Sequence, residues 1–201
     1  LIINANEVIT MASDVKGPRT KEAMKDIGVR KNVSLLLADR RIVDIAPLET
    51  LHLAYPQLMK KVEVIDASGK VVMPGLIDCH THLVHGGTRE DEFQMRLEGK
   101  TYMEIMNAGG GIYNTTKKTR AASFEQLYAK AYLRLNDFLK HGVTTVEAKS
   151  GYGLDWENGK KQLQVVKALQ EKHPIDIVPT FMGAHAVPQE YKGNEDAFVD
   201  V

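Results

Sequence analysis

The sequence predicts an α/β fold, with a small β unit over residues 1–70 and the first three βα units of a parallel sheet over residues 71–201. Short apolar runs separated by turn residues fill the first part, which is typical of β structure. From Val71 onward, apolar strands alternate with longer helical segments, and parallel strands need such crossovers. This order fits either a doubly wound sheet or a (β/α)₈ barrel.

Turn residues organise the first unit. The polar pair Asp39-Arg40 separates two apolar runs and indicates a hairpin, and Ser68-Gly69 does the same further on. The resulting prediction is a strand at 1–10, a loop at 18–31, a hairpin at 34–46 and a hairpin at 62–72.

Capping boxes and apolar periodicity define the second unit. Thr101 and Ser123 each begin a capping box, and Gly109 and Gly142 end the two helices that follow. Apolar residues in the longer helix recur at i, i+3, i+4 and i+7, so we expect one buried face: Phe124, Leu127, Tyr128, Ala131, Leu135, Phe138 and Leu139. The predicted elements are strand 76–84, helix 101–109, helix 123–142, strand 143–149, helix 157–172 and strand 175–181.

Composition excludes several classes of protein. The 201 residues include 26 Lys plus Arg and 26 Asp plus Glu, so the formal net charge is zero and no nucleic-acid partner is expected. No apolar run has the length of a membrane span, and the first residues lack the features of a signal peptide, so we expect no membrane partner and a cytoplasmic location. A single Cys excludes a disulfide framework within the chain. The chain begins at Leu1 and stops at Val201 in an acidic, apolar stretch, so we expect both ends to be cut.

The segment Asp78-Cys79-His80-Thr81-His82 is the strongest chemical feature. Because side chains alternate along a strand, His80 and His82 are expected on one face, where two imidazoles form half of a transition-metal site. Asp78 shares that face and could orient an imidazole, whereas Cys79 is expected to pack on the other face. A His-x-His pair also occurs by chance, but its position at the carboxyl end of an apolar strand favours a site.

Polar residues follow the next two strands as well. The second strand leads through Glu147 and Lys149 to Tyr152, and the third leads to His185. Because the carboxyl ends of parallel strands lie at the same edge of a sheet, we expect these groups to lie close together there.

Arg89 follows the first strand in a loop that contains two glycines. An arginine there suits a bidentate grip on a substrate carboxylate, and the alternative is an ion pair with Glu90 or Asp91.

The other notable residues are expected to be structural. Glu147 and Lys149 are expected to form an ion pair, Gly109–Gly111 to end a helix, and His141 and His173 to be cations at helix C-termini. His52 is expected on the surface and Trp156 in the core. His85, just after the first strand, is left unassigned.

Several segments resemble a known family. Pro74-Gly-Leu-Ile-Asp-Cys-His80-Thr-His82 is similar to the first-strand motif of the amidohydrolase superfamily, which comprises metal hydrolases built on a (β/α)₈ barrel. Four longer stretches resemble the imidazolonepropionase family within it: residues 86–93, 102–112, 142–153 and 180–188.

The resemblance implies hydrolysis of 4-imidazolone-5-propanoate to N-formimidoyl-L-glutamate in histidine degradation. It implies one divalent metal, zinc or iron, a small-molecule substrate and a homodimer. Carried over by position, it assigns metal ligands and substrate-pocket residues: His80 and His82 for the metal, and Arg89, Tyr102, Tyr152 and His185 for the pocket. His185 also receives a catalytic, polarising role.

The family pattern includes later strands that bring a third histidine, a glutamate, another histidine and an aspartate. The resemblance therefore implies that residues 1–201 are the N-terminal half of the enzyme, inactive alone, with residues 1–70 part of a small β-sandwich domain. Two alternatives remain: another cyclic amidase or deaminase of the superfamily, and a non-catalytic fragment that only shares the scaffold.

Overall fold

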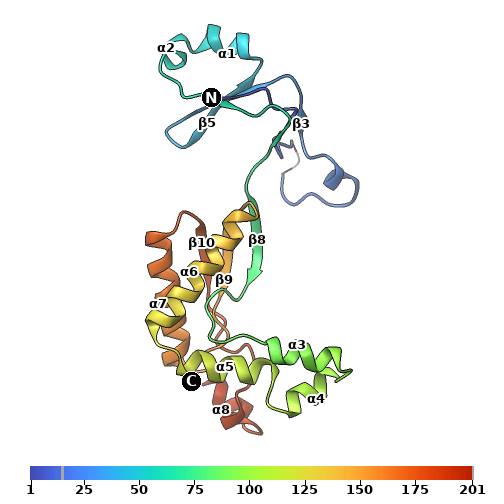
Figure 1. Ribbon diagram of the computed structural model, residues 1–201, viewed down its shortest axis with the longest axis vertical. Coiled ribbons are helices and arrows are strands. Elements are labelled where there is room, and N and C mark those ends of the chain that lie inside the picture. The colour runs from blue at the N-terminus through green and yellow to red at the C-terminus, as the bar shows by residue number, and fades with distance from the viewer. Residues whose placement is uncertain (15, 201) are drawn as a thin grey trace. The chain divides into compact units, whose positions relative to one another are not determined.

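The computed structural model describes residues 1–14 and 16–200, and the chain divides into two compact units, Leu1–Pro74 and Gly75–Val201 (Figure 1). The division falls four residues after the change of pattern predicted from the sequence. Each unit has its own sheets and its own buried apolar cluster.

Two small sheets form the first unit. One is four-stranded, in the order β5-β4-β1-β6, and the other is three-stranded, in the order β3-β2-β7. The strands are β1 (Ile2–Ile3), β2 (Glu7–Ile9), β3 (Val29–Arg30), β4 (Ser34–Ala38), β5 (Arg41–Ala46), β6 (Ile65–Asp66) and β7 (Val71–Val72).

The hairpin over residues 34–46 is confirmed. β4 and β5 pair antiparallel, and the turn residues Asp39 and Arg40 both have positive φ, 50° and 63°. Two positive φ angles define a type I′ turn, whose twist matches that of the flanking strands.

The other two β predictions for this unit are wrong in their pairing. Residues 1–10 form two strands in different sheets, and residues 62–72 form no hairpin, because β6 pairs parallel with β1 and β7 pairs parallel with β2. The turn at Ser68-Gly69 exists, with the Lys70 amide donating to the Ala67 carbonyl at 3.0 Å. Each strand finds its partner about sixty residues away, which a local turn signal cannot reveal.

The sequence prediction missed the helices of this unit. Helices α1 (Leu48–Ala54) and α2 (Pro56–Met59) follow β5, and a 3-10 helix η1 (Lys21–Lys25) lies in the predicted loop, which ends in β3. Leu51 of α1 is fully buried against Leu1 and Leu36, so α1 closes the small core of the first unit.

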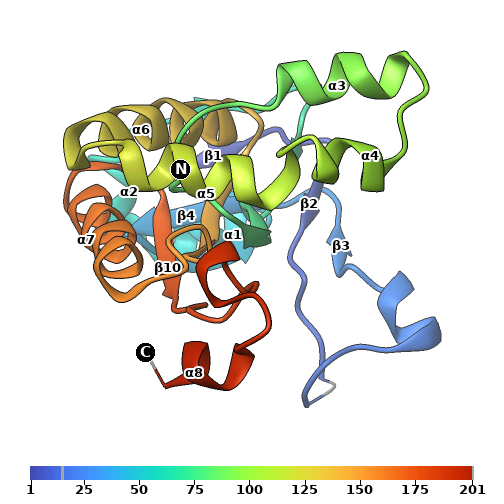
Figure 2. The same cartoon turned by 90° about the horizontal axis from the view of Figure 1, so that it is seen from below.

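The second unit is built on a three-stranded parallel sheet in the order β10-β9-β8, which confirms the α/β class and the three predicted strands. The elements are β8 (Leu76–Thr81), α3 (Glu90–Leu97), α4 (Tyr102–Asn107), α5 (Gly111–Ala121), α6 (Phe124–Lys140), β9 (Val143–Lys149), α7 (Trp156–Lys172), β10 (Asp176–Thr180), the 3-10 helix η2 (Gln189–Tyr191) and α8 (Glu195–Val199). Figure 2 shows the chain from below, where α3, α4 and α5 of the second unit can be followed one after another.

Both predicted capping boxes are present. The Thr101 and Ser123 side chains accept from backbone amides of α4 and α6, and Glu104 and Gln126 bond back to the caps. Gly109 ends α4 with φ 85°, as expected for a helix stop. Helices α3 and α5 were not predicted.

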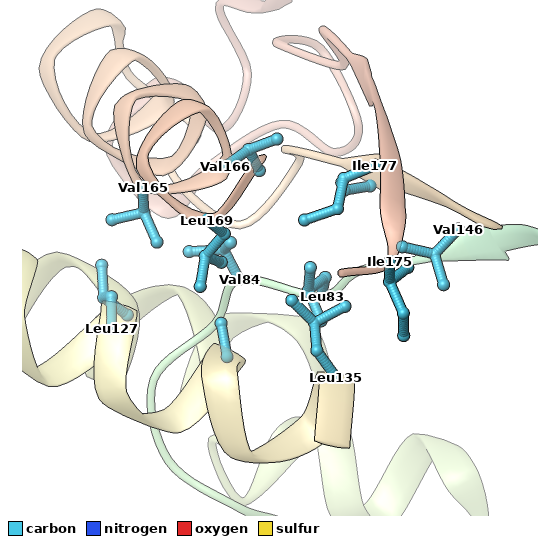
Figure 3. Packing of buried hydrophobic residues seen from close by; sticks show 12 residues of the cluster. Leu83, Val84, Leu127, Leu135, Val146, Val165, Val166, Leu169, Ile175 and Ile177 are labelled. Carbon is cyan, nitrogen blue, oxygen red and sulfur yellow. The ribbon is translucent and has the colours of Figure 1, made fainter. Parts of the chain in front are cut away.

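The core of the second unit lies between the sheet and helices α6 and α7 (Figure 3). Leu127, Ala131 and Leu135 of α6 are fully buried, as the apolar periodicity predicts. Leu139 is 41% exposed and Trp156 is 57% exposed, so both differ from their predicted core positions. Trp156 is the first residue of α7, where its side chain lies beyond the buried stripe.

The opposite face of the sheet is open. Ile77 of β8 and Val178 of β10 are 69% and 52% exposed, although both belong to apolar strands. No helix in the described residues is both long and apolar enough to cross a bilayer.

We predict that truncating Leu135 to alanine lowers the free energy of unfolding by about 2–5 kcal/mol, because it leaves a cavity in a packed core. Leu133 on the same helix is 64% exposed, so Leu133→Ala is the matched control and should change stability by about 0.5 kcal/mol at most. Urea denaturation measures both, and equal losses would contradict the assigned core face.

Candidate functional site

The register of the parallel sheet brings three strand ends to one place. Thr81 of β8 pairs with Ala148 of β9, and Thr180 of β10 pairs with Lys149. All three strands therefore end at the same level, and the segments that follow them start side by side.

β8 is irregular just before its end. Asp78 pairs with Val146 and Thr81 with Ala148, so three steps on β8 match two on β9, which is a β-bulge. The Asp78 carboxylate accepts from the backbone amide of His80 at 3.2 Å. It therefore supports the bulge backbone rather than an imidazole, contrary to expectation.

The two histidines of the motif are neighbours. The ring centroids of His80 and His82 lie 5.8 Å apart at an interplanar angle of 66°. Cys79, which precedes His80, is exposed and does not pack as expected, because β8 is an edge strand with no neighbour beyond it in the described sheet. Thr81 is buried and donates its hydroxyl to the Glu147 carbonyl at 2.6 Å.

His82 is held in one tautomer. Its Nδ1 lies 3.0 Å from the Ser150 carbonyl oxygen, which can only accept, so Nδ1 carries the proton. Burial lowers the pKa of His82, and the nearby His185, His80 and Lys149 lower it further, against the opposing effect of the Ser150 bond. At neutral pH the ring is uncharged and its Nε2 lone pair is free, which is the state that a metal ligand needs.

Ser150 and Gly151 were not singled out from the sequence. The buried Ser150 joins two strand ends, because its amide donates to the Thr180 carbonyl at 3.0 Å and its Oγ accepts from the Met182 amide at 2.9 Å. Gly151 has φ 87°, and a Cβ there would lie 3.1 Å from a ring carbon of His82. Only glycine lets this loop pass so close to the histidine without strain.

Tyr152 lies at the centre of the site. Its ring centroid is 4.7 Å from that of His82, 5.9 Å from that of His185 and 6.0 Å from that of His85. The guanidinium carbon of Arg89 lies 6.0 Å from the same ring centroid. The rings of His82 and His185 are themselves 4.7 Å apart.

The structure thus brings together five of the six residues assigned by the resemblance: His80, His82, Arg89, Tyr152 and His185. Tyr102 differs, because it lies on α4 with 58% of its surface exposed, and no ring contact in the described residues joins it to Tyr152. Its role in a pocket stays a prediction, as do the roles of the other five.

Arg89 is fixed at one end and open at the other. It is the N-cap residue of α3, and its Nε donates to Oγ1 of the buried Thr115 on α5 at 2.9 Å. Within the described residues it forms no ion pair with Glu90 or Asp91, so that alternative is not realised. Its two terminal amino groups are left to bind an anion, and a bidentate arrangement suits a carboxylate.

His85, unassigned from the sequence, is half-buried beside Tyr152. Arg134 of α6 donates to the carbonyls of Leu83 and His85 at 2.9 and 3.2 Å, and to His85 Nδ1 at 3.4 Å. Burial, followed by the Arg134 charge, lowers the pKa of His85 to about 4, so its ring is neutral at pH 7.

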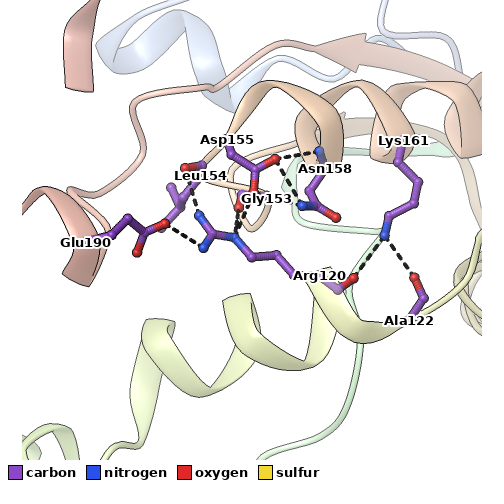
Figure 4. A network of polar contacts seen from close by, with 8 residues as sticks. All are labelled: Arg120, Ala122, Gly153, Leu154, Asp155, Asn158, Lys161 and Glu190. Carbon is purple, nitrogen blue, oxygen red and sulfur yellow. Dashed lines mark hydrogen bonds and ion pairs between the residues drawn. The ribbon is translucent and has the colours of Figure 1, made fainter. Parts of the chain in front are cut away.

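Arg120, near the end of α5, fixes the loop that follows Tyr152 (Figure 4). It donates to the carbonyls of Gly153 and Leu154 at 2.7 and 2.9 Å, and it pairs with Asp155 at 2.9 Å and Glu190 at 2.6 Å. One guanidinium thereby joins α5, the loop after β9 and the segment after His185. No local motif marks Arg120, so the sequence analysis did not find it.

The structural roles expected for other polar residues are mostly confirmed. Lys149 pairs with Glu147 at 2.5 Å, and Thr180 donates to the same carboxylate at 2.7 Å, which together hold the pKa of Glu147 below its usual range. His52 is exposed, and His141 caps α6. His173 caps α7 but is buried, and burial lowers its pKa, so it is not the cation expected there.

His80 and His82 fit a metal ion as part of a ligand set. The Nδ1 bond of His82 to a backbone carbonyl is the support that metal-bound imidazoles usually have. Among the described residues, however, no group of three or more His, Cys, Asp or Glu could hold a metal. Because zinc sites take three or four protein ligands, these residues supply only a part of one.

Comparison with known proteins relates the sequence to amidohydrolases. Residues 63–121 match the model of an amidohydrolase family. An imidazolonepropionase of Brevibacillus brevis is 55% identical over 200 residues, covering 100% of this chain and 47% of the relative. One of Geobacillus sp. is 53% identical with the same coverage, and one of Streptococcus pyogenes is 47% identical over 202 residues. The resemblance to imidazolonepropionases is confirmed, and the chain spans about half the length of these curated relatives.

Two solved structures share the fold at low sequence identity. E. coli guanine deaminase has a TM-score of 0.60 at 14% identity, covering 97% of this chain and 42% of that protein. A. niger ochratoxinase has a TM-score of 0.51 at 19% identity, covering 90% of this chain and 30% of that protein. These similarities support the α/β fold alone.

We predict that Arg120→Ala makes the loops that follow β9 and β10 more mobile. It removes charged hydrogen bonds to two carbonyls, so we expect a loss of about 2 kcal/mol in unfolding free energy and faster hydrogen exchange at the Ser150 and Met182 amides. Lys161→Ala is the matched control, because Lys161 binds the Arg120 and Ala122 carbonyls but not the loop. If both variants speed exchange at these amides equally, Arg120 does not fix the loop.

We predict that His85→Phe alters the pH dependence of stability. The pKa of His85 is about 4 in the folded chain and about 6.5 when unfolded, so the unfolded state binds more protons between these values and stability falls as pH falls through that range. Burial and the charges of Arg134, Arg89 and His82 disfavour its protonation, and a hydrogen bond with the Gly86 backbone opposes them. The phenylalanine variant should gain stability relative to the parent from pH 7 to pH 4, as measured by urea denaturation. A constant difference across this range would contradict the assignment.

Proposed function

We propose that this chain is one part of an imidazolonepropionase, a metal-dependent hydrolase that opens the cyclic amide of 4-imidazolone-5-propanoate to give N-formimidoyl-L-glutamate. The observation that carries the proposal is the placement of two different groups about Tyr152. The ring of His82, itself next to that of His80, contacts Tyr152, and so does the guanidinium of Arg89, whose terminal amino groups have no hydrogen-bond partner among the described residues. A ring with a carboxylate tail needs both kinds of group at once.

Arg89 binds the propionate in this proposal. Its Nε is held by Thr115, so little side-chain freedom is lost when its terminal amino groups bind a carboxylate. The tilted contacts of Tyr152 place a flat aromatic surface beside the guanidinium, against which the five-membered ring can lie.

His80 and His82 would hold the metal, with the ring of His82 neutral and its Nδ1 bound to Ser150. A divalent ion bound there supplies an activated water and polarises the ring carbonyl. Zinc and iron accept the same ligands, so both stay candidates. The remaining ligands and the general base would come from the part of the relatives that this chain does not span, so we expect residues 1–201 to be inactive alone.

His185 is the proposed polarising residue. Its ring centroid lies 4.7 Å from that of His82, at a tilt of 36°, and 5.9 Å from that of Tyr152. A group there can hydrogen-bond the substrate ring or the developing oxyanion. Tyr102 is kept as a pocket residue on the resemblance alone.

We also propose that the parallel sheet is part of a (β/α)₈ barrel and that the first unit belongs to a β-sandwich domain. The exposed apolar side chains of Ile77 and Val178 support the barrel, because closing the sheet would bury that face. Both β8 and β10 are edge strands of the described sheet, and a barrel has no edges. The homodimer and the cytoplasmic location stay predictions.

We predict that the full-length protein that carries this sequence contains a divalent metal and hydrolyses imidazolonepropionate in preference to hydantoin and guanine. His82→Ala should lower metal content and reduce turnover by more than about 100-fold, because a ligand and its oriented tautomer are lost. Elemental analysis and steady-state kinetics measure these effects.

His52→Ala is the control, because His52 is an exposed histidine in the first unit. It should keep both metal and activity. A preference for hydantoin or guanine would instead support another cyclic amidase or a deaminase. A metal-free inactive protein would support a scaffold without catalysis.

A further inference from the structure

His85 has no role in the reaction as described, yet it lies inside the site. Its ring is edge-on to Tyr152, with centroids 6.0 Å apart and an interplanar angle of 79°. The charges of Arg89 and His82 both disfavour protonation of the ring. Arg89 contacts the same ring, with its guanidinium carbon 6.0 Å from the Tyr152 centroid, so His85 and Arg89 share Tyr152 as a neighbour.

The tautomer of His85 follows from its partner. An arginine guanidinium has only donors, so the 3.4 Å contact with Arg134 makes His85 Nδ1 the acceptor. A neutral ring then carries its proton on Nε2. Burial and the Arg134 charge lower the pKa of His85 to about 4, against the opposing effect of a hydrogen bond with the Gly86 backbone, so the ring is neutral at pH 7. Arg134 also binds the carbonyls of Leu83 and His85, so the ring and its backbone are held together.

The charges around His85 favour an anion. Arg89 and Arg134 approach it from α3 and α6, and neither forms an ion pair within the described residues. Arg134 donates to two carbonyls and to His85 Nδ1, whereas the terminal amino groups of Arg89 have no hydrogen-bond partner in the part of the chain that the structure describes. A carboxylate can accept about four hydrogen bonds, so one that accepts two from Arg89 can still accept another from a further donor.

We propose that His85 is a second carboxylate-binding residue, whose Nε2–H donates to the substrate carboxylate beside Arg89. This inference rests on the proposed function, because it assigns a further contact to the same substrate. The competing explanation is that His85 only accepts a hydrogen bond from Arg134 and so keeps the loop after β8 in place.

The test compares two stable ligands of the full-length protein. 3-(Imidazol-4-yl)propionate carries the carboxylate, and 4-propylimidazole lacks it. We expect His85→Phe to weaken binding of the propionate about tenfold, as for the loss of one hydrogen bond to a charged group, and to leave the propyl ligand unchanged. His85→Gln can accept and donate, so it should keep most of the propionate affinity. Isothermal titration calorimetry measures the dissociation constants of both ligands for the parent and for each variant.

Arg89→Met separates this inference from the proposed function. If Arg89→Met abolishes the preference for propionate but His85→Phe leaves it intact, the role of His85 is overturned and the proposed function stands. If neither variant changes the preference, the carboxylate site itself is wrong. Equal weakening of both ligands by His85→Phe would mean a structural role and would also overturn the inference.

A measurement on the unaltered protein covers the case in which His85→Phe does not fold. In protein labelled with ¹⁵N-histidine, NMR should show the His85 proton on Nε2. The Nε2 resonance should shift on addition of the propionate ligand and not on addition of 4-propylimidazole. A proton on Nδ1, or an unmoved resonance at saturation, would overturn the proposal.

Discussion

The site depends on the parallel pairing of β8, β9 and β10 in a register that ends all three strands together. Thr81, Ala148, Lys149 and Thr180 lie at one level of the sheet, so three loops begin side by side. The bonds of Ser150 to Thr180 and Met182 continue that alignment beyond the ladder. Without this register, the histidines after β8 and β10 would not meet.

Two arginines hold the loops that follow the strand ends of the sheet. Arg120 binds two carbonyls and two carboxylates around the loop after Tyr152, and Arg134 binds the segment after β8. Guanidinium groups suit this task because they offer several donors in a fixed plane and stay charged when half-buried. The neutral state of the nearby histidines complements this arrangement, because burial and cationic neighbours both disfavour their protonation.

Local signals explain the elements that could be predicted. The capping boxes at Thr101 and Ser123, the apolar stripe of α6 and the three parallel strands all follow from short-range patterns. Helix α5 was missed because the residues it buries include three threonines, Thr115, Thr116 and Thr119, rather than an apolar stripe. Helix α3 was missed because it exposes its apolar residues and buries Glu92, whose carboxylate accepts from the Gly111 amide at 2.9 Å.

By itself the sequence determined which residue types could do chemistry and in what order they follow the strands, because residue type and order along the chain are local facts. His80, His82 and Arg89 were found in that way. Only the tertiary structure decided which groups meet: it left Tyr102 exposed, brought His85 beside Tyr152 and gave Arg120 its partners on two other segments. The physical reason is that tautomer, burial and pairing are set by partners distant in the chain, such as Ser150 for His82 at 3.0 Å, and no local pattern records them.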